Sequence, residues 1–159
     1  MEKNLQLPGN PRYQPKQLAN IFGYDNLYQP YIEVEIATLE TLYEFGIMPK
    51  KDWLTITNSV LQSLKQVTTS EVDKLEKTVT KHDIRALVKI MQSIAGPQAS
   101  RWIHVPLTSY DPIETARTLQ FIRAFQSSLT PSIKQLFMEM VDKIGSSYQI
   151  PQIGRTHGQ

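Results

Sequence analysis

Apolar side chains recur every three or four residues through most of this chain, and this spacing constrains the fold more than any other feature of the sequence. Side chains three and four positions apart lie on one face of an α-helix, whereas a half-buried strand requires strict alternation of apolar and polar residues. The segment 84–94 shows the helical spacing at Ile84, Leu87, Val88, Met91 and Ile94. Because no segment alternates convincingly, we predict an all-α fold.

Two helix starts in the second half of the chain predict its longest helices. Asp111 as an N-cap, a proline at the next position and Glu114 together form a strong start, so we predict a helix over 111–128. A Thr-Pro pair repeats the signal and predicts a last helix over 130–147. We expect these two helices to fold back on each other as a hairpin.

The change from short to long helices also suggests a division of the chain. Residues 1–110 are expected to form an N-terminal helical domain, and residues 111–159 the first helices of a long helical bundle. Two helices alone leave much of their apolar surface in water. We therefore expect that further chain downstream, or a second chain, covers these stripes.

The charge pattern and composition exclude several classes of protein. The 17 Lys and Arg residues are interleaved with 15 Asp and Glu residues, and the formal net charge is +2. Nucleic-acid binding is not expected, because it requires a concentrated basic face. No apolar run reaches the roughly 18 residues of a membrane span, and no signal peptide opens the chain, so the expected location is the cytoplasm. The absence of cysteine excludes thiol catalysis and disulfides.

A first group of polar residues lies at the predicted start of the helix that contains residues 84–94. Thr80 is expected to open this helix, with Lys81, His82 and Asp83 in its first turn. His82 would then stand at the second helical position, where its ring N–H and the Lys81 ammonium could face an anion. Polar first turns are also ordinary solvated caps, and the local pattern alone favours that simpler interpretation.

Thr108 and Ser109 form a second group, just before the predicted helix 111–128. Their hydroxyls and the free backbone N–H groups converge at the positive end of the helix dipole, where a carboxylate could dock. Hydroxyl residues are also common in turns and caps, so the local pattern again favours a structural role. His104 is expected to be a packing histidine beside Trp102.

Arg12 and Tyr13 lie in the N-terminal arm, and His157 lies in the C-terminal stretch GRTHGQ. A guanidinium next to a phenol can clamp a phosphate, although an isolated RY pair is usually surface decoration. Glycines near His157 allow a backbone to approach a ligand closely, and an imidazole exchanges protons near neutral pH. A histidine this close to a chain end would usually belong to a frayed tail.

In order and approximate spacing, these groups resemble the aspartase/fumarase superfamily, and most closely its adenylosuccinate lyase family. The motifs that carry the resemblance are an RY pair, the helix YIEVEIATLETLYEFGIMP, a TKHD helix start, the segment WIHVPLTSYD and the loop GRTHGQ. The last two motifs are specific and the first is weak. The resemblance covers nearly the whole chain, and five ordered matches outweigh the simpler interpretation of each group.

The resemblance implies that most of the singled-out residues bind substrate. By resemblance, Arg12 and Tyr13 would hold the phosphate end of the nucleotide, and Thr108 and Ser109 would bind the succinyl carboxylates. The group Lys81, His82 and Asp83 would help to bind the substrate. Lys81, Pro106 and Tyr110 stand where the family usually has Arg, Gly and a small residue. The last two are expected to crowd the carboxylate turn and to affect substrate preference.

The resemblance also implies a reaction, the elimination of fumarate from adenylosuccinate and from SAICAR in purine nucleotide biosynthesis. His157 would be the general acid or base near the departing nitrogen. The chemistry requires no metal and no organic cofactor. In the superfamily, a serine-bearing loop lies far downstream, and each active site combines residues from three subunits of a homotetramer. We therefore expect these 159 residues alone to be inactive.

Two alternatives stay open at this point. Within the superfamily, the chain could belong to another lyase, such as argininosuccinate lyase, or to a cycloisomerase. The RY arm and the KHD helix start favour a nucleotide substrate. Outside enzymes, the exposed stripes of the last two helices are also consistent with a non-catalytic helical interaction protein.

Overall fold

The computed structural model describes residues 11–151 and Gly154, and within these residues it contains helices and no strands. This confirms the all-α prediction. The α-helices are α1 Lys16–Phe22, α2 Gln29–Glu44, α3 Lys50–Trp53, α4 Asn58–Lys65, α5 Thr69–Leu75, α6 Asp83–Ala99, α7 Tyr110–Ala124 and α8 Thr130–Ser147. The short 3-10 turns are η1 Pro11–Tyr13, η2 Tyr24–Asn26 and η4 Ser100–Trp102, and the π turns are η3 Glu76–Thr80 and η5 Phe125–Leu129.

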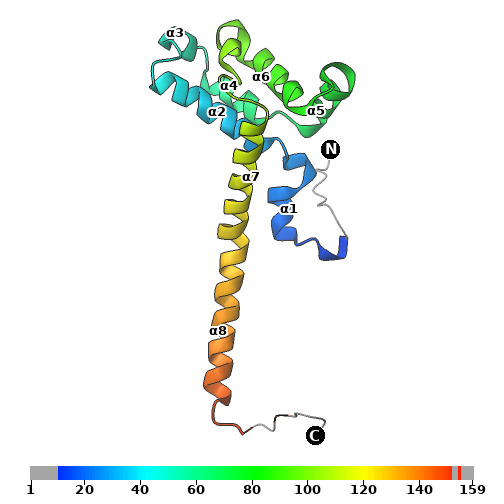
Figure 1. Ribbon diagram of the computed structural model, residues 1–159, viewed down its shortest axis with the longest axis vertical. Helices are drawn as coiled ribbons and strands as arrows, with labels where there is room; N and C mark the ends of the chain where they lie inside the picture. The colour runs from blue at the N-terminus through cyan, green and yellow to red at the C-terminus, as the bar shows by residue number, and fades with distance from the viewer. Residues whose placement is uncertain (1–10, 152–153, 155–159) are drawn as a thin grey trace.

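The helices form a compact head and a long rod (Figure 1). Helices α2 to α6 make the head, and α1 lies beside the upper part of the rod, where it contacts α7. The core of the head is built from apolar stripes on α2 and α6. The fully buried members of these stripes include Ile32, Leu39, Ile84, Leu87 and Met91. Burial of one such side chain is worth about 1.5–3 kcal/mol, so the helical spacing seen in the sequence supplies the main stabilisation of the head.

Two glycines with left-handed backbone mark helix ends in the head. Gly46 has a φ of 70° and follows the end of α2. Gly96 has a φ of 78° and breaks α6, which resumes for one more turn from Pro97 to Ala99. Residues with a side chain rarely adopt this conformation, so glycine is the residue that ends a helix there. Pro30 lies in the first turn of α2, where a proline is tolerated.

The rod is one continuous helix, and the predicted hairpin of two helices is therefore wrong. Helices α7 and α8 are joined through the π turn Phe125–Leu129, in which the Thr130 N–H donates to the carbonyl of Phe125. A proline ring within an ordinary α-helix clashes with the carbonyl four residues earlier. The wider π turn just before Pro131 gives that ring room, so the Thr-Pro pair does not break the helix. The end of α8 at Ser147 is as predicted.

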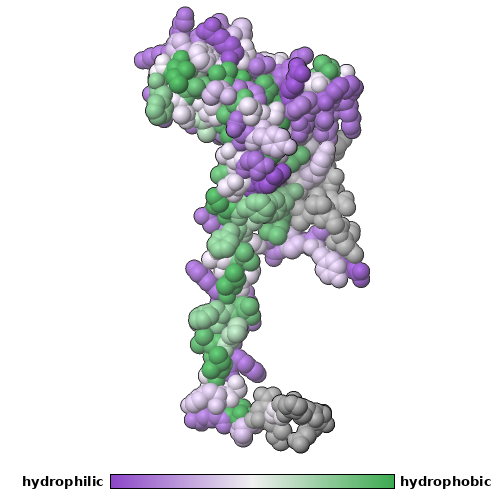
Figure 2. Space-filling view, in the orientation of Figure 1, coloured by the Kyte–Doolittle hydropathy of each residue, from purple (hydrophilic) through white to green (hydrophobic). Residues whose placement is uncertain are grey.

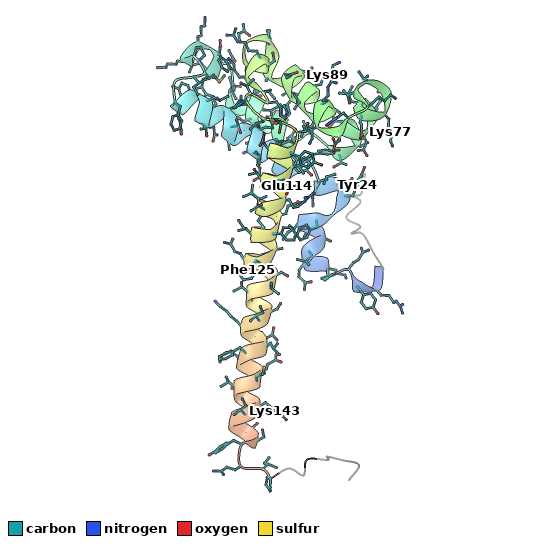
Figure 3. The ribbon with its side chains drawn as sticks, viewed as in Figure 1. Tyr24, Lys77, Lys89, Glu114, Phe125 and Lys143 are labelled. Atoms are coloured by element: carbon teal, nitrogen blue, oxygen red, sulfur yellow. The ribbon has the colours of Figure 1, made fainter. Side chains whose placement is uncertain are left out.

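The rod carries an apolar stripe that stays largely exposed in the described part of this chain, with α1 against its upper end. Figure 2 shows apolar residues along the rod below the head. Exposed members of the stripe are Phe121, Phe125, Leu129, Ile133, Leu136, Phe137, Met140 and Ile144. In Figure 3, Phe125 lies partway down the rod and Lys143 lies near its lower end. Among the described residues, no helix is both long and apolar enough to cross a membrane.

Candidate functional site

The turn before α7 holds the hydroxyl pair of the candidate site. The Asp111 carboxylate reaches back to Thr108 and accepts hydrogen bonds from its backbone N–H at 2.6 Å and from its hydroxyl at 3.0 Å. Ser109 is the N-cap and Tyr110 the first helical residue, so the expectation that Asp111 is the N-cap is wrong. Asp111 is instead the second residue of α7, and its carboxylate bonds back to Thr108 before the helix. The Thr108 hydroxyl is consequently engaged before any ligand arrives.

These bonds predict a pH-dependent contribution of Asp111 to stability. They hold the pKa of its carboxyl below the usual range, with the backbone bond from Thr108 as the main cause. A depressed carboxyl pKa stabilises the fold above the unfolded-state value, roughly 3.9 for Asp, and the contribution is lost as pH falls through the folded value. Asp111→Ala should therefore lower the urea midpoint at pH 7, and the difference from wild type should shrink below about pH 4.

Urea titrations of both chains across this pH range check the prediction. Asp142→Ala, on the exposed surface of α8, is the matched control and should shift the midpoint little at any pH. An Asp111→Ala difference that is independent of pH would contradict the assigned bonds.

At the start of α6, the polar residues Lys81, His82 and Asp83 lie at other helix positions than predicted. His82 is the N-cap, and its ring Nδ1 accepts from the Arg85 backbone N–H at 3.5 Å. Thr80 ends the preceding π turn and donates its hydroxyl to the His82 carbonyl at 2.8 Å. Lys81 has left-handed backbone, and its ammonium donates to the Lys77 carbonyl. The π turn uses Thr80, so this residue cannot also open α6, and the prediction of His82 at the second helical position is wrong.

Charged residues at the starts of α6 and α7 both act on one residue of α2, Tyr31. Burial is the main cause that raises the pKa of the Tyr31 hydroxyl, and Arg117 on α7 opposes that shift. The carboxylates of Asp83 on α6 and Glu114 on α7 raise it further. Charges influence a titrating group only over a limited range. The Tyr31 hydroxyl is therefore within electrostatic range of both helix starts. Figure 3 shows Glu114 near the top of the rod, just below the head.

Arg12 and Tyr13 are separated from the other groups within this chain. They form part of η1, where the Arg12 guanidinium lies 5.8 Å from the centre of the Tyr13 ring. Figure 1 shows this turn next to the lower end of α1, on the side away from the rod, and away from the starts of α6 and α7. His157 lies outside the described residues. Within the part that the structure describes, no group of three or more His, Asp or Glu side chains is arranged to hold a metal ion.

Two buried carboxylates that were not predicted from the sequence hold the segment leading to Thr108. Glu35 is 1% exposed and accepts from the backbone N–H of His104. Asp52 is 2% exposed and accepts from the Trp102 ring at 2.9 Å and from Arg101. The bonds from Arg101 and Trp102 lower the pKa of the Asp52 carboxyl. His104 was expected only to pack beside Trp102, and its bond to the Glu35 carboxylate was not predicted.

One of these carboxylates has a recognisable signal in the sequence. Glu35 lies three residues after Ile32 and four before Leu39, so it falls on the buried stripe of α2. An acid on such a stripe requires a partner, because an unpaired buried charge is costly. Asp52 lies in a polar Lys-Lys-Asp-Trp stretch, and no comparable pattern marks it.

Comparisons with known proteins give consistent matches over nearly the whole chain. A family model described as Lyase matches residues 13–159. Adenylosuccinate lyase of Methanocaldococcus jannaschii is 29% identical over 158 residues, which cover 99% of this chain and 33% of that protein. The enzyme of Archaeoglobus fulgidus is 32% identical over 152 residues, covering 96% and 32% respectively. That of Streptococcus mutans is 26% identical over 149 residues, covering 92% and 32%. The chain thus spans about a third of the length of these relatives, and no solved structure matches it significantly.

Proposed function

This chain belongs to the Lyase family, and we propose that it forms the N-terminal part of an adenylosuccinate lyase, which eliminates fumarate from adenylosuccinate and from SAICAR in purine nucleotide biosynthesis. The observation that carries the proposal is the match to three adenylosuccinate lyases over 92–99% of the chain. The hydroxyl pair at the start of a helix supports it, because the reaction develops negative charge on a substrate carboxylate.

Thr108 and Ser109 are proposed to bind the succinyl carboxylates. The positive end of the α7 dipole favours an anion there. Since the Thr108 hydroxyl donates to Asp111 in the unliganded chain, binding exchanges that acceptor for a substrate oxygen. His157 is proposed as the general acid or base near the leaving nitrogen, and no residue proposed here requires a metal or an organic cofactor.

The nucleotide end of the substrate is assigned to two groups. We propose that Arg12 and Tyr13 hold the phosphate and that Lys81, His82 and Asp83 help to bind the substrate. Because η1 lies away from the start of α6 in this chain, the Arg12–Tyr13 pair of one copy would complete the site of another. This arrangement requires an oligomer.

The rod gives the proposed oligomer its surface. Large apolar patches on a protein surface are commonly association sites, and the rod presents such a stripe over much of its length. A groove of about 1050 Å³ between α1 and the rod, lined in part by Phe22 and Phe125, continues this surface. We propose a homotetramer of the complete enzyme, located in the cytoplasm, in which 1–110 is the N-terminal domain and 111–159 begins the central bundle.

Release of fumarate from defined substrates tests the function. The complete enzyme should release fumarate from adenylosuccinate and not from argininosuccinate, followed by the absorbance of the product. The 159-residue chain alone should show no turnover. Turnover of argininosuccinate instead would assign the chain to another lyase of the superfamily. Turnover by the isolated chain would refute the requirement for further residues, and a complete polypeptide inactive on both substrates would favour an interaction protein.

A further inference from the structure

Glu35 is a buried carboxylate whose two oxygens contact the same residue. Its Oε2 accepts from the backbone N–H of His104 at 3.0 Å, and its Oε1 lies 2.6 Å from the ring Nδ1 of His104. The two residues are 69 positions apart in the sequence and join α2 to the segment before α7. Such short contacts with both oxygens fix the orientation of the ring as well as its position.

These contacts determine where the ring carries its proton. A backbone N–H can only donate, so Oε2 must accept. An ionised carboxylate is also only an acceptor, so the contact between Oε1 and Nδ1 requires a proton on Nδ1. We propose that Glu35 is a positioning residue that fixes the His104 proton on Nδ1 and leaves Nε2 as the nitrogen available to a ligand at the turn before α7.

The backbone conformation of His104 also supports a positioning role for Glu35. His104 has a φ of 69°, in the left-handed region that residues other than glycine seldom adopt. Such strain persists where surrounding bonds impose it and is concentrated at functional sites. The bond from the His104 N–H to Glu35, and that from Trp102 to Asp52 two residues earlier, impose it here.

His104 lies four residues before Thr108, in the segment that leads into the turn proposed to bind substrate. When its ring is protonated, His104 adds to the lowering of the Asp111 pKa, after the bonds from Thr108, so the residue is within electrostatic range of that turn. Its side chain is 21% exposed, which leaves part of the ring open to a ligand. The role in substrate binding rests on the proposed function, whereas the position of the proton does not.

Glu35→Gln tests the position of the proton. The substitution keeps the shape of the side chain but replaces one acceptor oxygen by an NH₂ donor. The backbone N–H of His104 still requires an acceptor, so the glutamine carbonyl should take the place of Oε2 and the amide NH₂ should face Nδ1. Nδ1 must then accept, and the proton of the neutral ring moves to Nε2. The tautomer of His104 should therefore invert, as read from the ¹⁵N resonances of its ring in the labelled 159-residue chain.

The chain contains three histidines, so the assignment is tractable, and His82 supplies an internal reference whose signals should not change. Glu33→Gln, two residues away on the same helix and partly exposed, is the matched control and should leave the His104 tautomer as in wild type. A neutral wild-type ring protonated on Nε2 would overturn the proposal, whether or not the Glu35→Gln chain folds. A folded Glu35→Gln chain with an unchanged tautomer would also overturn it.

In the complete enzyme, Glu35→Gln should lower kcat/KM by about 10- to 100-fold, as loss of the carboxylate partner of a functional histidine does, and Glu33→Gln should not. An inverted tautomer with unchanged kcat/KM would retain the assigned proton and remove His104 from the substrate site. Absence of adenylosuccinate turnover in the wild type would refute the proposed function and leave the proton assignment standing.

Discussion

Replacement of His157 by alanine in the complete enzyme is expected to lower the turnover of adenylosuccinate by about 10²- to 10⁴-fold, the contribution of a positioned general acid or base. The physical reason is that elimination must deliver a proton to the leaving nitrogen while a carbon–hydrogen bond breaks next to a carboxylate. An imidazole can donate and accept protons near neutral pH, and His157 lies in the GRTHGQ loop that carries the family resemblance.

Steady-state kinetics of fumarate release measure this effect. The loss should fall on kcat, because a proton transfer acts in the transition state more than in substrate binding. Sedimentation and circular dichroism should show the same assembly and helix content as wild type. Gln159→Ala, two residues along, should retain normal turnover. A His157→Ala enzyme with near-normal kcat would remove this residue from the proposed catalytic list.

The helices of the head could be predicted from the sequence because local signals define them. The stripe of α6, the early proline of α2 and the left-handed Gly46 all act within one helical turn of the position they determine. The continuous rod could not be predicted in this way. A Thr-Pro pair is a valid helix start, and only the π turn before it allows the helix to pass through without a break.

The candidate site could also be predicted only in part from the sequence. The resemblance identified Thr108, Ser109 and His82 as candidate site residues. It did not predict the hydrogen bonds that Thr108 and His82 make within the chain. The reach of Asp111 back to Thr108 and the use of His82 as a cap depend on whether a turn is α, 3-10 or π. The contact between Glu35 and His104 depends on the packing of two segments far apart in the chain, which residue spacing does not encode.

Leu87→Ala is expected to destabilise the chain by about 2–5 kcal/mol, the range for removing a fully buried leucine side chain. Leu87 is 1% exposed and lies in the centre of the apolar stripe of α6. A domain of ordinary stability has about 5–15 kcal/mol in total, so the loss is a large fraction. Urea unfolding of the 159-residue chain, followed by circular dichroism, measures the change.

Leu54→Ala provides the matched control, because Leu54 lies just after α3 with 64% of its surface exposed. The same chemical change there should alter the free energy of unfolding by less than about 0.5 kcal/mol. Similar losses for both leucines would contradict the assigned core. A selective loss at Leu87 would mean that the buried stripe of α6 holds this helix in the head, and with it His82 at its start.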